Sequence, residues 1–465
     1  MALKLFNTMT RSKDEFHPLE PGHVRMYTCG PTVHDFAHIG NFRAYTFEDL
    51  LRRFLKFKGY KVTQVMNLTD IDDKTIKKSI AQNVSLRDYT AVYKKAFFED
   101  LDRLGIERAE FYPEATTHIP EMVDIVKKLL ARGYAYEVGG NYYYSIAKFR
   151  NYGNLSHLDM SGLKAGARVA ADEYEKESVS DFALWKAWDE NDGDVFWETE
   201  LGKGRPGWHL ECSAMSMKYL GETFDIHTGG VDNMFPHHEN EIAQSEGASG
   251  KKFVNLWLHC EHLIVEGRKM AKSFKNFYTL RDILEKGYPS IAVRYLLLAT
   301  HYRQQLNFTF EGLDAARNGL VRYNDFYSNL LDYGGEGASG EAGEYIDKML
   351  LGFETALDDD LNISQALGEV FDFIRDINRL KAENKLSGDE RNRALSAMDR
   401  IESVLNFRVK KEETSETGIE ALIQKRAEAK KNRNFAEADR IRLELFKMGI
   451  ILEDTPSGTK WKRKL

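Results

Sequence analysis

The sequence contains little cysteine: three residues in 465, at Cys29, Cys212 and Cys260. Three thiols so far apart exclude the disulfide framework of a small secreted protein and fit a reducing cytosol, so we expect a cytoplasmic protein. Long apolar runs are missing as well, so we expect neither a membrane span nor a signal peptide over residues 1–18. The thiols are therefore available as metal ligands.

Excess positive charge is also missing. The formal net charge is -7, from 65 basic and 72 acidic residues, and the chain as a whole therefore repels phosphate groups. Any contact with a nucleic acid must come from a local basic patch. The C-terminal end supplies one, with an aromatic residue inside it: Lys460, Trp461, Lys462, Arg463 and Lys464.

What is present near the N-terminus is a pattern of strand, loop, helix and strand. Residues 24–29 form a β-rich run that Gly30 and Pro31 end, residues 41–58 carry apolar side chains at helical spacing, and residues 62–67 return as a strand. This is the first unit of a parallel α/β sheet, and the start of its helix is an anion site. Strand patterns resume at 224–227 and 253–259.

The chain exceeds the length at which one hydrophobic core stops growing, so we expect several domains. The predicted fold class is α/β: a Rossmann-like parallel-sheet catalytic domain with an inserted domain, followed by an α-helical bundle and a small C-terminal domain. Residues 110–205 are predicted to be short aromatic strands and turns, and the chain beyond Ser273 is predicted to be helical. The boundaries are 1–109 with 206–275, 110–205, 276–333, 344–406 and 418–465, and the glycine-rich residues 334–343 indicate a linker.

Two short segments point to nucleotide chemistry. His38 stands at the predicted helix start with Gly40 and Asn41 behind it, where unpaired N–H groups and an imidazole can contact phosphate. Lys269 and Lys272 lie three apart in a glycine-led basic loop that can close over a triphosphate. Taken singly, a histidine in a turn and a solvated surface loop explain these segments equally well or better.

A third group of residues has the chemistry of a metal site. Cys29 ends the first strand, Cys212 lies far along the chain, and His237 and Glu241 are four apart and share a helix face. Two thiolates, an imidazole and a carboxylate suit zinc. The spacing is not that of a zinc finger, however, and buried cysteines and a surface His–Glu pair remain the alternative.

In their order along the chain, the two nucleotide segments resemble the HIGH and KMSKS motifs of class I aminoacyl-tRNA synthetases. Asn41 replaces the second histidine of the first motif and Ala271 replaces the first serine of the second. Residues 30–33, 67–74, 205–216 and 235–245 resemble cysteinyl-tRNA synthetases from end to end. The resemblance implies that ATP, L-cysteine and tRNA(Cys) give cysteinyl-tRNA(Cys), AMP and diphosphate through a cysteinyl-adenylate.

The same resemblance assigns roles to individual residues. It implies one zinc ion per subunit, bound to the substrate thiolate and held by Cys29, Cys212, His237 and Glu241; Cys260 is left to the core. It implies a cysteine pocket lined by Thr69, Trp208 and His227, and catalytic roles for His38 and Lys272. It implies ATP, with Mg²⁺, at His38, Gly40, Asn41, Lys269 and Lys272.

Gly229, Gly230 and Asp232 are further candidates for the adenosine pocket, in a predicted turn after the strand that holds His227; an ordinary strand-ending turn is an equal alternative. The resemblance further implies that residues 110–205 contact the tRNA acceptor end, 276–333 its stem and 418–465 its anticodon, in a monomer.

Two rival functions remain. One is a related ligase that makes the same adenylate but transfers cysteine to a small amine; such ligases lack the C-terminal tail that this chain has. The other is a zinc-containing RNA-binding protein that has lost catalysis, which His38 and Lys272 argue against.

Overall fold

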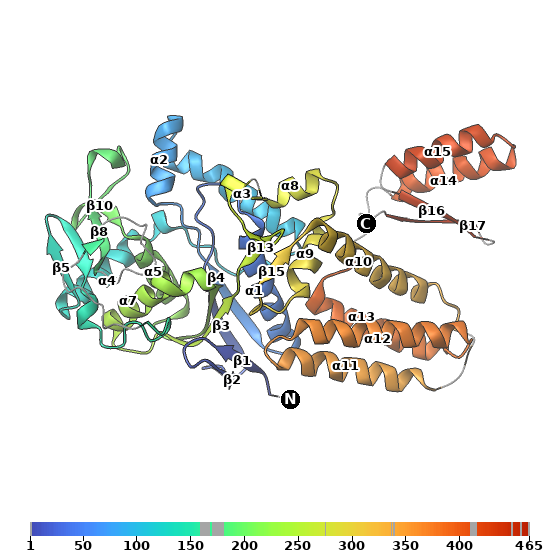
Figure 1. Ribbon diagram of the computed structural model, residues 1–465, viewed down its shortest axis with the longest axis horizontal. Coiled ribbons are helices and arrows are strands. Elements are labelled where there is room, and N and C mark those ends of the chain that lie inside the picture. Colours follow the sequence, from blue (N-terminus) through green and yellow to red (C-terminus); the bar gives the residue numbers. More distant parts are fainter. Residues whose placement is uncertain are drawn as a thin grey trace.

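The computed structural model describes residues 2–158, 168–169, 181–274, 276–335, 337, 340–409, 416–447, 450–455 and 458–463. It has an α/β body with the inserted sheet at one end and a helical bundle at the other, and a small C-terminal unit lies beside the bundle (Figure 1). Among the described helices, none combines the length and apolar character that crossing a membrane requires.

The body is built on a four-stranded parallel sheet in the order β12-β11-β3-β4. The strands are β3 (His23–Thr28), β4 (Lys61–Met66), β11 (Phe224–Gly230) and β12 (Val254–Cys260), close to the four strands predicted. Helix α1 (Ile39–Phe57) joins β3 to β4, and α7 (Glu239–Ser249) lies between β11 and β12. The chain leaves β3 and β11 in opposite directions along the sheet, and ligands bind at such a switch point, outside the carboxyl ends of the strands.

The inserted region lies between β4 and β11. It contains α2 (Asp73–Gln82), α3 (Leu86–Arg103) and α4 (Ile119–Ala131), then an antiparallel sheet in the order β5-β6-β8-β10-β9. These strands are β5 (Ala135–Val138), β6 (Asn141–Tyr144), β8 (Asp181–Ala187), β9 (Trp197–Thr199) and β10 (Gly202–Pro206), with β7 (Arg168–Val169) paired to β8. The prediction of strands and turns throughout 110–205 was wrong at α4. Its buried Met122, Val126 and Leu129 recur at helical spacing and pack against α5 and α7.

Beyond the body the chain is mostly helical. The helices are α8 (Leu280–Glu285), α9 (Ser290–Ala299), α10 (Phe310–Leu331), α11 (Ala342–Asp358), α12 (Ile363–Ala382) and α13 (Gly388–Leu405). Short strands interrupt the predicted helical region: β15 (Leu306–Phe308) joins β13 (Leu263–Val265) and β14 (Arg268–Lys269). The C-terminal unit has α14 (Glu416–Lys431) and α15 (Phe435–Lys447), as predicted, and a hairpin of β16 (Ile450–Thr455) and β17 (Gly458–Arg463) that carries the basic end. Near the N-terminus, β1 (Lys4–Asn7) pairs with β2 (Ser12–Glu15).

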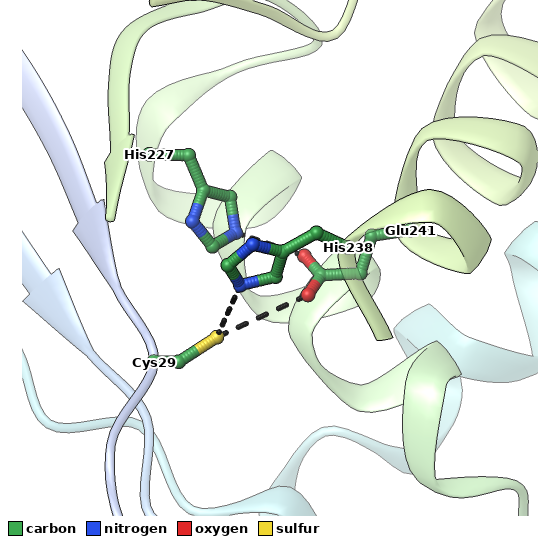
Figure 2. A group of neighbouring side chains, drawn as sticks. All are labelled: Cys29, His227, His238 and Glu241. Carbon is green, nitrogen blue, oxygen red and sulfur yellow. Dashed lines mark hydrogen bonds and ion pairs between the residues drawn. The ribbon is translucent and has the colours of Figure 1, made fainter. Parts of the chain in front are cut away.

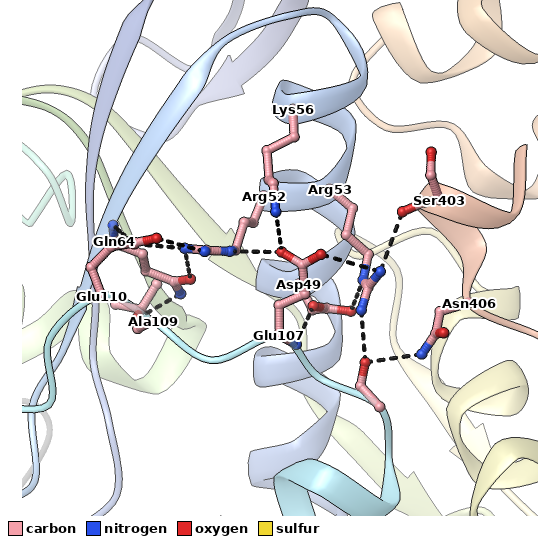
Figure 3. A network of polar contacts seen from close by, with 12 residues as sticks. Asp49, Arg52, Arg53, Lys56, Gln64, Glu107, Ala109, Glu110, Ser403 and Asn406 are labelled. Atoms are coloured by element: carbon pink, nitrogen blue, oxygen red, sulfur yellow. Dashed lines mark hydrogen bonds and ion pairs between the residues drawn. The ribbon is translucent and has the colours of Figure 1, made fainter. Parts of the chain in front are cut away.

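The helical bundle and the body share one continuous hydrophobic core. A buried polar network joins them at α1 (Figure 3). The Asp49 carboxylate lies 2.8 Å from Arg53 Nε and 2.6 Å from Arg294 of α9. Arg53 donates to the Ser403 carbonyl at 3.2 Å, and Arg294 Nε donates to the Leu405 carbonyl at 2.9 Å, both at the end of α13. The helix that begins at the nucleotide motif is therefore fixed to the end of the bundle.

Candidate metal and nucleotide site

The structure brings together the four residues that the resemblance implies as zinc ligands. Cys29 follows β3, Cys212 lies on α5 (Trp208–Leu220), His237 lies on the π-helical turn Met234–His238, and Glu241 lies in the first turn of α7. One ligand atom from each lies within 4.8 Å of all the others, and all four residues are buried. His237 Nε2 is 3.0 Å from Glu241 Oε1, as expected of a pair that shares a helix face.

A second set of possible ligands overlaps the first: Cys29, His227, His238 and Glu241 (Figure 2). His238 Nε2 is 3.2 Å from Cys29 Sγ, and His227 Nε2 is 3.0 Å from Glu241 Oε2. A second contact orients the His238 ring: its other nitrogen, Nδ1, lies within hydrogen-bond distance of His259 Nε2, at 2.8 Å. His238 and His259 are not among the metal-site residues predicted from the sequence. The adjacent histidines of the Pro236-His237-His238 run were the signal for His238, whereas His259 comes close only through the order of the strands.

Burial and mutual hydrogen bonds shift the pKa values of all four candidate ligands. Burial raises the pKa of the Glu241 carboxyl well above its usual range and lowers the pKa of the His237 imidazole. Burial also raises the pKa of the Cys29 thiol well above its usual value. At Cys212 burial acts in the same direction, but hydrogen bonds from Cys29 and Tyr27 outweigh it, so that the pKa of this thiol is lowered. A divalent cation bound among these residues would favour the thiolate forms of both cysteines.

Of the three residues expected to contact cysteine, two lie against the metal cluster. The Trp208 indole stacks on the His237 ring with centroids 4.4 Å apart, and the His227 ring stacks on Trp257 at 4.6 Å. Thr69 is buried beyond the end of β4, where its hydroxyl accepts a hydrogen bond from Asn67 Nδ2 at 3.1 Å. Gly30 approaches this loop closely, since a Cβ at Gly30 would lie 1.8 Å from the Asn67 carbonyl oxygen.

A cavity of about 620 Å³ opens beside Cys29, at the carboxyl end of the sheet. Its lining includes six of the predicted ATP-site residues: His38, Gly40, Asn41, Gly230, Asp232 and Lys269. It also includes residues that were not predicted, among them Asn233, Glu261 and Gln305. Cys29 belongs both to this wall and to the metal cluster, so the two candidate sites are continuous.

The entry to α1 is organised by His38 and Asn41. His38 is the N-cap: its Nδ1 accepts a hydrogen bond from the Asn41 backbone N–H at 3.2 Å, and its own N–H donates to Asn41 Oδ1 at 3.1 Å. A Cβ at Gly40 would lie 3.0 Å from the His38 ring. Asn41 therefore has an identified function in the fold: it holds the backbone of His38 at the helix start.

The remaining nucleotide candidates differ in position. Gly229 and Gly230 are the last residues of β11 and Asp232 lies in the short helix Val231–Asn233, so the predicted turn after the strand was wrong. A parallel ladder to β12 extends the strand through both glycines. Lys269 lies exposed on β14. The side chain of Lys272 lies outside the described part of the structure; only its backbone, in the turn Lys272–Phe274, is described.

Comparison with known protein families gives three matches in chain order. Residues 15–318 match the catalytic domain of class I (C) tRNA synthetases, residues 352–409 match the DALR domain, and residues 415–461 match the anticodon binding domain of cysteinyl-tRNA ligases. The first match alone spans more than half of the chain.

Two cysteine–tRNA ligases are similar to this chain over nearly their full lengths. The cysteine–tRNA ligase of Protochlamydia amoebophila is 52% identical, covering 99% of this chain and 98% of that protein. The ligase of Brachyspira hyodysenteriae is 51% identical, covering 99% of each.

Solved structures agree in fold. Mycobacterium tuberculosis methionyl-tRNA synthetase has a TM-score of 0.57 at 13% identity, covering 83% of this chain and 90% of its own. Agrobacterium radiobacter leucyl-tRNA synthetase has a TM-score of 0.60 at 11% identity, covering 84% of each chain. The architecture is therefore that of class I synthetases.

Proposed function

The chain belongs to the cysteine–tRNA ligase family and is an aminoacyl-tRNA ligase, and we propose that it activates L-cysteine as cysteinyl-adenylate and transfers it to tRNA(Cys), with zinc binding the substrate thiolate. One observation carries the zinc part of the proposal: Cys29, Cys212, His237 and Glu241 are buried together, and Cys29 also lines the nucleotide cavity. Two sulfurs, an imidazole and a carboxylate are a donor set that zinc prefers.

Zinc gives this site a way to distinguish cysteine from serine, which differ by one atom. A pocket that relies on shape separates near-isosteres by only about 1–3 kcal/mol, too little for accurate translation without a second, hydrolytic site. A bound zinc ion deprotonates a coordinating thiol, whereas a serine hydroxyl resists ionisation. If zinc is held here, the carboxylate of Glu241 would be the protein group best able to make room for a substrate sulfur, because carboxylates bind metals through one oxygen or two.

The chain's own residues bind and orient the substrates. We propose that Trp208, Thr69 and His227 line the cysteine pocket, and that His38, Gly40 and Asn41 receive the phosphates of ATP at the start of α1. Mg²⁺ would accompany the nucleotide. The cysteine carboxylate attacks the α-phosphate and pyrophosphate leaves, while His38 and the loop lysines Lys269 and Lys272 stabilise the charge that develops.

Transfer to tRNA is supported by the C-terminal segment. Residues 415–461 match an anticodon binding domain, which a ligase acting on a small amine would not need. We propose that residues 110–205 contact the acceptor end, 276–333 the stem and 418–465 the anticodon. The domain boundaries, a monomeric state and a cytoplasmic location remain predictions from the sequence; light scattering on a sizing column measures the oligomeric state.

The test is cysteine-dependent exchange of pyrophosphate into ATP, followed by charging of tRNA(Cys), with serine as the control amino acid. The proposal expects both activities with cysteine, neither with serine, and one zinc ion per chain. Exchange without charging would indicate the amine ligase, and absence of exchange in zinc-loaded protein would refute the enzyme function.

A further inference from the structure

A buried hydrogen bond joins α1 to β11 beneath the nucleotide cavity. The Thr228 hydroxyl donates to Glu48 Oε1 at 2.9 Å, and both residues are at most 1% exposed. The second carboxyl oxygen, Oε2, is buried and has no hydrogen-bond partner among the described residues. A carboxyl group with one partner is costly inside a protein, so its retention between a helix and a strand calls for a reason.

The two residues lie under opposite walls of the cavity. Helix α1 supplies His38, Gly40, Asn41 and, one turn before Glu48, Tyr45. Directly after Thr228, β11 ends with Gly229 and Gly230, and Asp232 follows. Among the described contacts, the Glu48–Thr228 bond is the one side-chain hydrogen bond between α1 and β11, and it therefore links the two walls directly.

We propose that Glu48 is a positioning residue for the nucleotide: through Thr228 it holds the end of β11 against the helix that presents His38 and Asn41. The inference rests on the proposed binding of ATP in this cavity. The cysteine pocket depends less on this bond, because two of its three proposed residues, Trp208 on α5 and Thr69 after β4, lie outside β11. The third, His227, directly precedes Thr228 but is also held by its stack on Trp257 and its contact with Glu241.

The carboxyl acts in its neutral form. Burial raises the pKa of Glu48 to about 8. The other titratable groups that interact with it are Tyr45 on α1 and Cys260 on β12, and burial raises the pKa of each of these as well. A glutamine can therefore replace Glu48 and keep an acceptor for the Thr228 hydroxyl, whereas a leucine cannot.

The test compares variants in cysteine-dependent ATP–pyrophosphate exchange. Thr228→Val leaves the Glu48 carboxyl without its hydrogen-bond donor. It is expected to raise KM for ATP about tenfold, which corresponds to the loss of one buried hydrogen bond. The change in KM for cysteine is expected to be smaller. In Glu48→Gln, KM for ATP is expected to stay within about threefold of the parent value, because the amide oxygen still accepts the hydrogen bond from Thr228. In the double variant Glu48→Leu with Thr228→Val, KM for ATP is expected to rise less than in Thr228→Val alone, because neither side chain of the pair then leaves a polar group unpaired.

Thr46→Val is the matched control. It removes a buried hydroxyl from the same helix, but within the described part of the chain that hydroxyl bonds only the Phe42 carbonyl of α1, at 2.6 Å. KM for ATP is expected to be unchanged in this variant. Equal effects of Thr228→Val and Thr46→Val, or equal rises in KM for ATP and cysteine, would overturn the inference. Absence of exchange in the parent would instead refute the proposed function.

Discussion

Replacing Asp49 by asparagine removes the negative charge at the junction of α1, α9 and α13 (Figure 3) without changing side-chain size. The Asp49 and Arg294 side chains are 0% exposed and Arg53 is 11% exposed. Arg294 would therefore lose its buried counter-charge, and Arg53 would retain the partly exposed Glu107 carboxylate at 3.4 Å. Removing one partner of a buried ion pair costs about 3–5 kcal/mol. With an unfolding entropy of about 2.1 cal/mol/K per residue, a unit of roughly 400 residues should melt about 4–6 °C lower.

Differential scanning calorimetry measures this shift, and the chain offers a matched control. Asp372 pairs with Arg375 at 2.6 Å on α12, but the two side chains are 53% and 66% exposed. Asp372→Asn should therefore change stability by no more than about 0.5 kcal/mol, which is below about 1 °C. If Asp49→Asn melted no lower than Asp372→Asn, the network in Figure 3 would not hold the bundle to the body.

Two other predictions follow from buried and capping groups. Burial raises the pKa of Glu48 from an ordinary 4.5 to about 8. The contribution of its neutral form to the free energy of unfolding is therefore complete below pH 4.5 and is lost as the pH rises to 8. Between pH 5 and 7 the loss is about 1.4 kcal/mol per pH unit. Urea unfolding of Glu48→Gln should lack this slope, and curves parallel to those of the parent would contradict the buried neutral carboxyl. Asn41→Ala removes half of the capping pair with His38 and should cost about 0.5–2 kcal/mol of stability and raise KM for ATP. Calorimetry and exchange kinetics check this, and a raised KM for cysteine alone would argue against it.

Much of the fold could be predicted from the sequence, because its signals are local. The strands at 24–29 and 62–67 and the helix between them follow from β-rich composition, glycine and proline breaks and helical periodicity. Helix α4 was not predicted, although Met122, Val126 and Leu129 carry a helical period, because the aromatic strand patterns of 135–138 and 141–144 follow it within a few residues. The hairpin of β13 and β14 with β15 depends on a long-range pairing between residues 263–265 and 306–308 that no local pattern contains.

The candidate site shows the same division. Cys29, Cys212, His237 and Glu241 have chemistry that suggests a metal, but their meeting depends on the order of the strands and the crossing of α5 and α7. His238 and His259 enter only in three dimensions, through the contact between the π-helical turn and β12. Glu48 lies in a helix whose spacing predicts a buried face, and hydropathy alone does not predict a carboxyl there. What pairs it is Thr228, 180 residues away.

The central claim is that a protein-held zinc ion binds the sulfur of the substrate. X-ray absorption at the zinc edge tests this most directly, by counting sulfur ligands before and after addition of cysteine or serine. We expect two sulfur ligands, from Cys29 and Cys212, in the free protein. We expect a third sulfur ligand after addition of cysteine and no change in the sulfur count after addition of serine. A count that stays at two with saturating cysteine would contradict the claim and leave the metal a structural part of the fold.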